Sequence, residues 1–235
     1  MKELSISKRL DAICSFVSPG AVLLDVGTDH AYVPIYLIGN GIVDRAWASD
    51  INPGPLMIAE ENARVYGLSE KIVFYLSDGL DSCRCYENKY DHIVIAGMGG
   101  ELIFDILNRS HFVREYRPLL ILQPMTMQPY LRRELSSHGF SILKDIVVFE
   151  DNKFYTVMTC RYDGYIDVLD DFEMNFGKDI RSRARDGEPG IIDYLNRQRF
   201  LLNKISEGKK LGNQDHGKED QLVRSVTELL NEVSK

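Results

Sequence analysis

Acidic side chains stand at the ends of three short apolar segments in the first half of the chain. They are Asp29 after residues 23–26, Asp50 within 46–51 and Asp78 after 72–76. Short apolar segments bounded by turn residues are typical of buried strands. In doubly wound folds, ligands collect at the carboxyl ends of the parallel strands. The spacing therefore predicts one ligand site lined by carboxylates.

The loop from Gly27 to Ala31 limits which ligand this site can take. A dinucleotide-binding loop carries three glycines because its pyrophosphate lies against backbone N–H groups at a helix start. Here Asp29 and Ala31 replace the second and third glycines. A carboxylate beside a pyrophosphate is repelled by roughly several kcal/mol at low dielectric, but it suits a cationic ligand. The loop therefore favours S-adenosylmethionine, which carries a sulfonium and an ammonium, over the cofactor of an NAD-dependent oxidoreductase.

The other two acids extend this interpretation. Asp50 lies about 20 residues after the glycine loop, where a carboxylate accepts hydrogen bonds from two ribose hydroxyls. Asp78 follows the next strand and can reach the exocyclic amine of an adenine. Either residue alone is more often a helix N-cap or a turn residue. Together with the loop, however, they favour a ligand site.

Two further strand ends supply weaker candidates. The run Ala96-Gly97-Met98-Gly99-Gly100 replaces the Asp/Asn-Pro-Pro-aromatic clamp found in many amino-group methyltransferases. Its glycines let the backbone approach a flat ligand, although a tight strand-to-helix turn explains them equally well. Gln123 ends the fifth predicted strand, where it reads a base edge or caps the next helix. His30 is a candidate because it lies beside Asp29 at a helix start.

Composition excludes several classes of protein. The chain has 235 residues, of which 44% are hydrophobic, so it can bury a core. Its formal net charge of −7 argues against indiscriminate nucleic-acid binding. It has neither an apolar run of the ~20 residues that span a bilayer nor a signal pattern, so we expect a cytoplasmic protein. The four cysteines are scattered, and Cys83-Arg84-Cys85 lacks a second ligand pair, so we expect no metal site.

Strand-like and helix-like segments alternate through most of the chain. Predicted strands are 22–26, 46–51, 72–76, 92–96 and 118–123, and predicted helices are 3–17, 32–40, 55–66, 102–108 and 128–138. This alternation predicts a parallel sheet with helices on both faces. Strands 141–150 and 154–161 then follow with a three-residue link, which predicts an antiparallel hairpin. The expected fold class is α/β, a Rossmann-like class I methyltransferase sheet.

Beyond residue 163 the strands stop and a helical region is expected. Segments 189–207 and 219–233 have helical periodicity, and their apolar stripes can pair within one chain or between two. The stripes are Ile191, Leu195, Leu202 and Ile205, and Leu222, Val226, Leu229, Leu230 and Val233. A glycine-containing link between them predicts a small α-helical hairpin domain. The window 178–210 has nine Lys/Arg against five Asp/Glu, which suits either phosphate contacts or a solvated face. Its arginines are Arg181, Arg183, Arg185, Arg197 and Arg199.

Several long strings resemble one family. They are Asp25-Val26-Gly27-Thr28-Asp29-His30-Ala31-Tyr32, Asp50-x-Asn52-x-Gly54-Pro55-Leu56, Ser77-Asp78-Gly79-Leu80, Ile95-Ala96-Gly97-Met98-Gly99-Gly100 and Leu120-Ile121-Leu122-Gln123-Pro124. The chain from Leu4 to Cys160, including Arg9-Leu10, resembles the bacterial TrmK-type tRNA (adenine(22)-N1)-methyltransferases.

The resemblance implies a methyltransferase domain over 1–163, a coiled-coil-like tRNA-binding domain over 164–235, and S-adenosylmethionine as methyl donor. It implies that the donor is held by Asp25, Gly27, Thr28, Asp50, Ile51, Asn52, Asp78 and Gly79. It also implies that the target base, an adenine of the tRNA D-loop region, faces Asp29, His30, Gly97, Met98, Gly99 and Gly100. The string Phe176-Gly177-Lys178 departs from the Phe-Gly-Pro expected of the family.

Two alternatives share parts of this interpretation. A small-molecule methyltransferase uses the same donor but needs no basic helical appendage. A non-catalytic tRNA-binding protein keeps the fold while losing donor binding, and the intact strand-end acids argue against it.

Overall fold

The structure, a computed structural model, describes residues 4–234 and divides the chain into two compact units. The division falls between Val168 and Leu169, whereas the sequence predicts a boundary after residue 163. No helix within residues 4–234 is long and apolar enough to cross a membrane.

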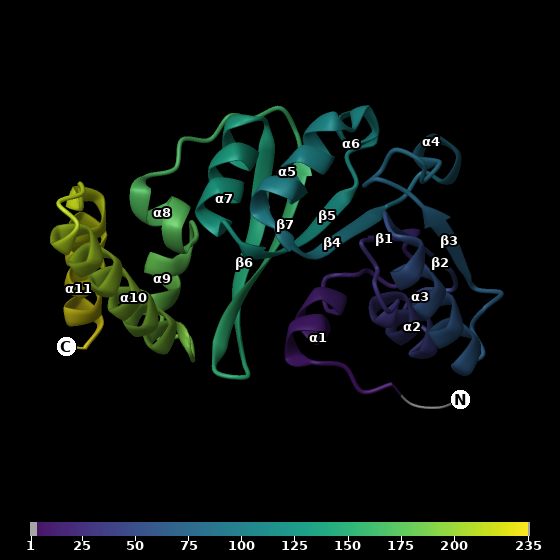
Figure 1. Ribbon diagram of the computed structural model, residues 1–235, viewed down its shortest axis with the longest axis horizontal. Coiled ribbons are helices and arrows are strands. Elements are labelled where there is room, and N and C mark those ends of the chain that lie inside the picture. Colours follow the sequence, from purple (N-terminus) through teal and green to yellow (C-terminus); the bar gives the residue numbers. More distant parts are fainter. Residues whose placement is uncertain (1–3, 235) are drawn as a thin grey trace. The chain divides into compact units, whose positions relative to one another are not determined.

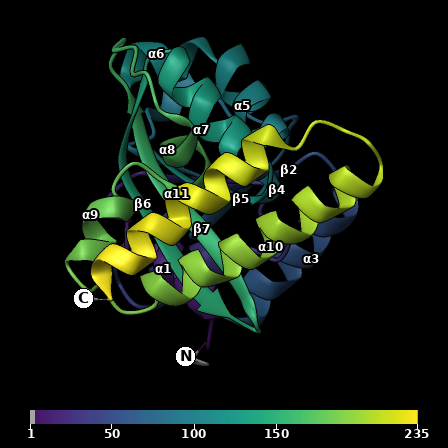
Figure 2. The same cartoon turned by 90° about the vertical axis from the view of Figure 1, so that its left-hand side faces the viewer.

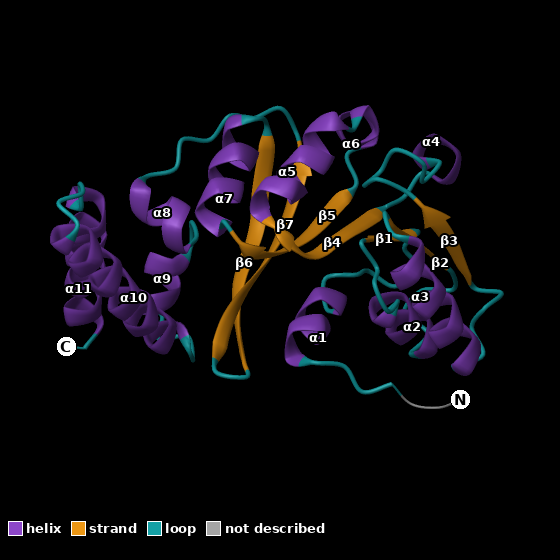
Figure 3. Ribbon diagram, viewed as in Figure 1, coloured by secondary structure: helices purple, strands orange, loops and turns teal. Residues whose placement is uncertain are grey.

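The first unit contains a seven-stranded sheet in the order β3-β2-β1-β4-β5-β7-β6 (Figure 3). Its strands are β1 (Leu23–Val26), β2 (Ala46–Asp50), β3 (Ile72–Leu76), β4 (His92–Gly99), β5 (Leu119–Thr126), β6 (Phe140–Glu150) and β7 (Lys153–Tyr162). Pairing is parallel from β3 to β5, and β7 pairs antiparallel with β5 and β6. The predicted fold class, including the terminal hairpin, is confirmed.

Helices cover both faces of this sheet (Figure 1). They are α1 (Lys8–Cys14), α2 (Tyr32–Gly39), α3 (Pro53–Val65), α4 (Cys85–Asn88), α5 (Gly100–Arg109), α6 (His111–Tyr116) and α7 (Gln128–Ser137). Two separate buried clusters follow from the two-residue period of the strands. On β4, for example, Ile93 and Ile95 belong to the cluster that includes residues of α5 to α7, and Val94 belongs to the cluster that includes residues of α1 to α3.

The sequence prediction was wrong at the start of the first helix. We predicted a helix over 3–17, of which Glu3 lies outside the described residues, but α1 begins only at Lys8. Ser7 has an extended backbone, and its hydroxyl accepts from the N–H of Leu10, which makes it the N-cap. Residues 5–7 are consequently free to line the main cavity of this unit. The short helices α4 and α6 were not predicted.

The second unit is helical. It contains α8 (Asp171–Phe176), α9 (Ile180–Arg185), α10 (Ile191–Leu211) and α11 (Gly217–Val233), of which α8 and α9 were not predicted. Helices α10 and α11 pack on each other as a hairpin within one chain (Figure 2). The predicted stripe on α10 is wrong at Ile205, which is exposed. Near that end of α10 the contact is polar instead, because the buried Ser206 donates to Asp220 of α11.

A buried ion pair joins α7 to β6. The side chains of Arg132 and Asp145 are only 1% and 3% exposed, and Arg132 Nε lies 2.6 Å from Asp145 Oδ2. A second contact of 3.3 Å runs from Arg132 Nη2 to Asp145 Oδ1. Removing one partner of such a pair leaves an uncompensated buried charge, whereas replacing both with apolar side chains removes the desolvation cost of both.

We therefore expect Arg132→Met to lower the free energy of unfolding by about 3 to 5 kcal/mol. The double variant Arg132→Met/Asp145→Leu should recover most of that loss. Urea denaturation of the wild type and both variants measures this. A double variant as unstable as the single one would contradict it.

Candidate active site

A cavity of about 670 Å³ opens at the carboxyl ends of the parallel strands. Its walls come from the last residues of β1, β2 and β4, from the segments that follow β1, β2 and β3, and from residues of α1, α2 and α5. This volume lies within the usual range for small-molecule sites. The cavity lies where β1 pairs with both β2 and β4, so that the strand order reverses, which is the usual ligand position in doubly wound sheets.

The loop after β1 forms one wall of the cavity. Asp25 is buried, and one of its oxygens, Oδ2, accepts a 2.6 Å hydrogen bond from the hydroxyl of Thr28. Gly27 has φ 71°, a conformation that a residue with a side chain rarely adopts. The methyl group of Met98 lies against Gly27, which brings the ends of β1 and β4 together.

Asp29 and His30 stand at the mouth of the cavity. Their side chains are 64% and 40% exposed, and His30 Nε2 lies 3.4 Å from Asp29 Oδ2. The ring of His30 also stacks on Tyr32 at a centroid distance of 5.2 Å. Asp29 has φ 51°, a left-handed conformation that Asp and Asn tolerate better than most residues. This backbone directs a carboxylate, an imidazole and a phenol to one exposed edge of the cavity.

The ends of β2 and β3 bring two more acids to the same cavity. Asp50 is buried, and its Oδ1 accepts from the backbone N–H of Asn52 at 2.9 Å. Asp78 is half exposed and pairs with Arg109 at the end of α5, with 3.0 Å between Oδ1 and Nη2. The hydrogen bond from Arg109 holds the pKa of the Asp78 carboxyl below its usual range. Ile51, between these acids, is largely exposed and lines the cavity.

The run from Gly97 to Gly100, at the end of β4 and the start of α5, divides into two halves. Gly97 and Met98 line the cavity, whereas Gly99 and Gly100 lie outside its lining. A side chain at Gly100 would come within 2.5 Å of the carbonyl oxygen of Met127, so this glycine lets α5 pack closely against the start of α7. Gly79, which does line the cavity, is also close-packed, because an added Cβ would lie 2.9 Å from the Ile106 side chain.

All predicted donor-binding residues therefore lie around one cavity, together with four of the six predicted to face the target base. The residues of both groups that line it are Asp25, Gly27, Thr28, Asp29, His30, Asp50, Ile51, Asn52, Asp78, Gly79, Gly97 and Met98. The prediction did not assign a role to Arg9, Tyr32 or Leu102, which also line it.

Gln123 fulfils neither role that the sequence suggested. It is buried and does not cap α7, whose N-cap position is Met127, and it does not line the cavity. Its Oε1 instead accepts a 2.7 Å hydrogen bond from Arg9 Nη1.

Burial changes the acid–base behaviour of Asp25. Desolvation, reinforced by the nearby Asp50, raises the pKa of Asp25 from 3.8 to about 6, against the opposing hydrogen bond from Thr28. The ionised carboxylate is therefore costly in this protein near neutral pH. A cationic ligand group placed beside Asp25 would offset that cost, which fits the ammonium or sulfonium of S-adenosylmethionine.

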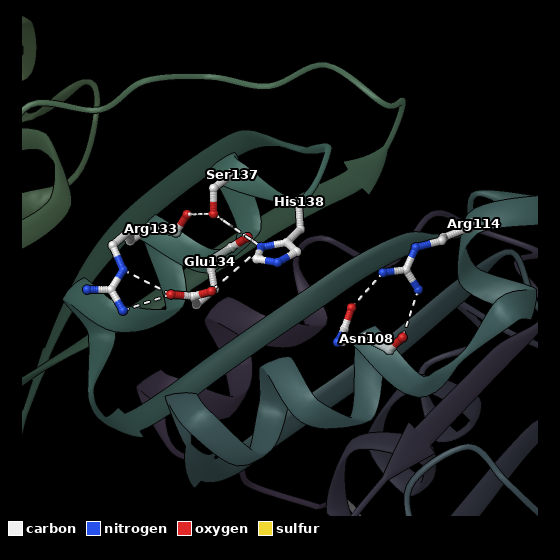
Figure 4. Close-up of polar contacts among 6 residues, drawn as sticks. All are labelled: Asn108, Arg114, Arg133, Glu134, Ser137 and His138. Atoms are coloured by element: carbon white, nitrogen blue, oxygen red, sulfur yellow. Dashed lines mark hydrogen bonds and ion pairs between the residues drawn. The ribbon is translucent and has the colours of Figure 1, made fainter.

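A polar cluster outside the cavity, among the described residues, does not form a hydrolytic centre. Near the end of α7, Ser137, His138 and Glu134 lie together (Figure 4), but His138 Nδ1 faces both the Ser137 hydroxyl at 3.1 Å and the Glu134 carbonyl oxygen at 2.8 Å. A hydrolytic triad needs the two ring nitrogens of the histidine to face different partners. Cys83 and Cys85 are buried free thiols. Within residues 4–234, no group of three or more His, Cys, Asp or Glu side chains is placed to hold a metal ion.

Comparison with known proteins agrees with this geometry. Residues 6–158 match the family described as methyltransferase domain. The chain is 35% identical over 158 residues to the tRNA (adenine(22)-N(1))-methyltransferase of Bacillus subtilis. The matched region covers 67% of this chain and 66% of the Bacillus subtilis protein, so the chain spans just under two thirds of that relative's length.

Solved structures match over almost the whole chain. A Streptococcus pneumoniae protein, named as a candidate tRNA (m1A22) methyltransferase and solved in complex with S-adenosyl-L-methionine, has a TM-score of 0.81 and 32% identity, covering 96% of this chain and 100% of that chain. M. capricolum TrmK, in complex with S-adenosyl-homocysteine, has a TM-score of 0.74 and 27% identity, covering 97% of this chain and 98% of that chain.

The raised pKa of Asp25 predicts opposite effects on stability and binding. Asp25→Asn keeps an acceptor for Thr28 but removes the buried charge, so it should raise the free energy of unfolding at pH 7.5 by up to about 3 kcal/mol. The gain should disappear below pH 3.8, where Asp25 is protonated in both folded and unfolded chains. The same variant should bind S-adenosylhomocysteine more weakly. Denaturation at both pH values and calorimetry test this, and an Asn variant less stable at pH 7.5 would contradict it.

Proposed function

The chain belongs to the TrmK-type family of tRNA (adenine(22)-N1)-methyltransferases, and from this premise we propose that it transfers a methyl group from S-adenosylmethionine to N1 of adenine 22 in tRNA. One observation carries the proposal. Four aspartates, Asp25, Asp29, Asp50 and Asp78, line a single cavity at the switch point of a methyltransferase-type sheet. Because its substrate is tRNA, we propose that the protein acts in the cytoplasm.

The donor-binding part of the cavity is assigned by the chemistry of its acids. Asp50 receives the ribose hydroxyls, because a carboxylate accepts two hydrogen bonds side by side. Asp25 faces the ammonium end, and Asp78 reaches the adenine amine. Ile51, exposed beside Asp50, offers an apolar surface for the adenine ring. Bound in this way, S-adenosylmethionine supplies an electrophilic methyl group, which the in-plane lone pair of a neutral adenine N1 attacks as the carbon–sulfur bond breaks.

The exposed residues at the mouth of the cavity position the target adenine and stabilise the charge that develops on it. Adenine N1 needs no deprotonation before attack, so positioning supplies most of the catalysis. The methylated base is cationic, and the exposed carboxylate of Asp29 stabilises that charge as it develops. His30 and Tyr32 add stacked rings to the lining, to which Gly97 also contributes.

We propose that the second unit binds the part of the tRNA that lies outside the cavity. Three of the five clustered arginines are neutralised by acids of their own unit, since Arg181 pairs with Asp170, Arg183 with Glu188 and Arg185 with Glu232. On α10, Arg197 and Lys204 instead flank the exposed ring of Phe200, at 5.7 Å and 4.6 Å from its centroid. Two cations and an exposed ring on one helix face suit phosphate and base contacts.

Asp29 should matter for turnover rather than for donor binding. Asp29→Asn keeps the left-handed backbone and the size of the side chain, so it is a better probe than alanine. We expect kcat to fall on the order of 100-fold, with the affinity for S-adenosylhomocysteine unchanged. Single-turnover kinetics and calorimetry separate the two, and an equal loss in both would assign Asp29 to the donor site.

Contacts on α10 should be recognisable by their salt dependence. Arg197→Gln/Lys204→Gln should weaken tRNA binding and reduce the slope of log K against log salt by about 1 to 2. Arg183→Gln, which removes an arginine already paired with Glu188, is the matched control and should change the slope less. If the control changes the slope as much, the contact does not lie on this face.

Labelled methyl transfer to an unmodified tRNA transcript tests the function itself. Incorporation should be lost with a transcript in which adenine 22 alone is replaced by guanine. Incorporation that survives this replacement would reject the target base. Donor binding without methylation of any tRNA would leave a small-molecule methyltransferase, and absence of donor binding would leave a tRNA-binding protein without catalysis.

A further inference from the structure

Asp78 differs from the other acids that we assign to the donor in its exposure to solvent. It lies on the loop after β3, and its side chain is 52% exposed. Asp25 and Asp50, in contrast, are buried and accept hydrogen bonds from residues that follow them closely in the chain. An exposed carboxylate changes rotamer freely and is hydrated, so it recognises a ligand group well only when a neighbour fixes its direction.

Arg109, the last residue of α5, contacts both oxygens of the Asp78 carboxylate. Its Nη2 donates to Oδ1 at 3.0 Å, and its Nη1 donates to Oδ2 at 3.4 Å. A second acid, Asp81, lies farther from this guanidinium, with 3.8 Å between its Oδ2 and Nη1. Because the guanidinium is planar and meets both oxygens, it fixes the plane of the Asp78 carboxylate as well as its position.

Helix α5 is itself packed against the loop that carries Asp78. The next residue, Gly79, has φ 58°, and a Cβ added there would lie 2.9 Å from the side chain of Ile106. Ile106 is buried, lines the cavity and lies one turn before Arg109 on α5. The close approach of Ile106 to Gly79 therefore sets the position from which Arg109 reaches Asp78.

The ion pair leaves Asp78 able to accept from a ligand. Each carboxylate oxygen has two lone-pair sites, so one hydrogen bond from Arg109 to each oxygen leaves a site on both. Asp78 lines the cavity whereas Arg109 does not, so the guanidinium contacts the carboxylate from outside the lining. A half-exposed ion pair contributes little to stability, so we expect its effect in ligand binding rather than in folding.

From this arrangement we propose that Arg109 is a positioning residue, which fixes Asp78 to accept from the exocyclic amine of the donor's adenine. Arg109 thereby sets the preference of the cavity for adenine over a purine that lacks this amine. The proposal rests on the proposed use of S-adenosylmethionine and on the assignment of Asp78 to its adenine. Arg109 touches no ligand and acts only through Asp78.

Calorimetry with two ligands tests the proposal without relying on activity. One ligand is S-adenosylhomocysteine, and the other is a counterpart whose purine carries hydrogen in place of the amine. The wild type should prefer S-adenosylhomocysteine about 10-fold, the lower end of what a hydrogen bond to a charged group contributes. Arg109→Met should reduce this preference to about threefold or less by weakening the binding of S-adenosylhomocysteine alone.

Three further variants sharpen the test. Arg64→Met is the matched control, because Arg64 is an exposed arginine paired with Glu61 and neither residue lines the cavity, so both affinities should stay unchanged. Arg109→Lys keeps the charge without the planar fork and should give an intermediate preference. In an Asp78→Ala background, Arg109→Met should have no further effect on the preference, because the residue that it positions is gone.

The outcomes are distinct. If Arg109→Met weakens both ligands equally, Arg109 serves only to attach α5 to the loop, and the proposal is overturned. If it changes neither affinity, the ion pair has no part in binding, which also overturns it. A wild type that binds both ligands equally would show that Asp78 does not recognise the amine, and the proposal fails while donor binding stands. If the wild type binds neither ligand, the proposed function itself fails.

Discussion

Parallel pairing of β1 with β2 on one side and β4 on the other is the constraint on which the site depends. Because these strands run in one direction, their carboxyl ends share an edge, and the residues after each strand meet there even though they lie far apart in sequence. The antiparallel hairpin of β6 and β7 adds to this frame, since Tyr155 of β7 and Gln123 of β5 together hold Arg9. The sheet thus brings the acids of the cavity together, and two of its strands contact Arg9 of α1, the one Lys or Arg that the described residues contribute to the lining.

Electrostatic strain is the second general feature of this cavity. Burial of the Asp25 carboxylate, with Asp50 nearby, costs folding free energy in the ligand-free protein. A ligand that brings positive charge relieves this cost, so the same arrangement that destabilises the free protein selects for a cationic donor. Arg109, which does not line the cavity, pairs with Asp78, and Arg9 is a cation within the lining. The four aspartates of the lining therefore favour a ligand that carries positive charge.

The sequence predicted the positions of strand ends, because these depend on local patterns, but it did not predict contacts between residues far apart in the chain. Asp29, Asp50 and Asp78 could be expected at one edge because each ends or follows an apolar strand, and the alternation of strands and helices implies which ends meet; Asp25 was assigned only through the family resemblance. Gly100 could not be separated from Gly97, because only its approach to Met127, 27 residues away, makes it a packing position. The contact between Arg9 and Gln123 spans 114 residues, so no local pattern indicates it. The start of α1 was predicted too early because the apolar periodicity extends back to Ile6, whereas the helix begins only after its N-cap, Ser7.

The account is tested most directly by a crystal structure of the protein with S-adenosylhomocysteine bound. We predict that the ribose lies at Asp50, the adenine lies between Ile51 and Asp78, and the amino-acid end lies beside Asp25. The sulfur should then face the opening beside Asp29 and Gly97, where the target adenine enters. A ligand bound in the reverse direction, or outside this cavity, would contradict the central claim that the strand-end charges select and orient the methyl donor.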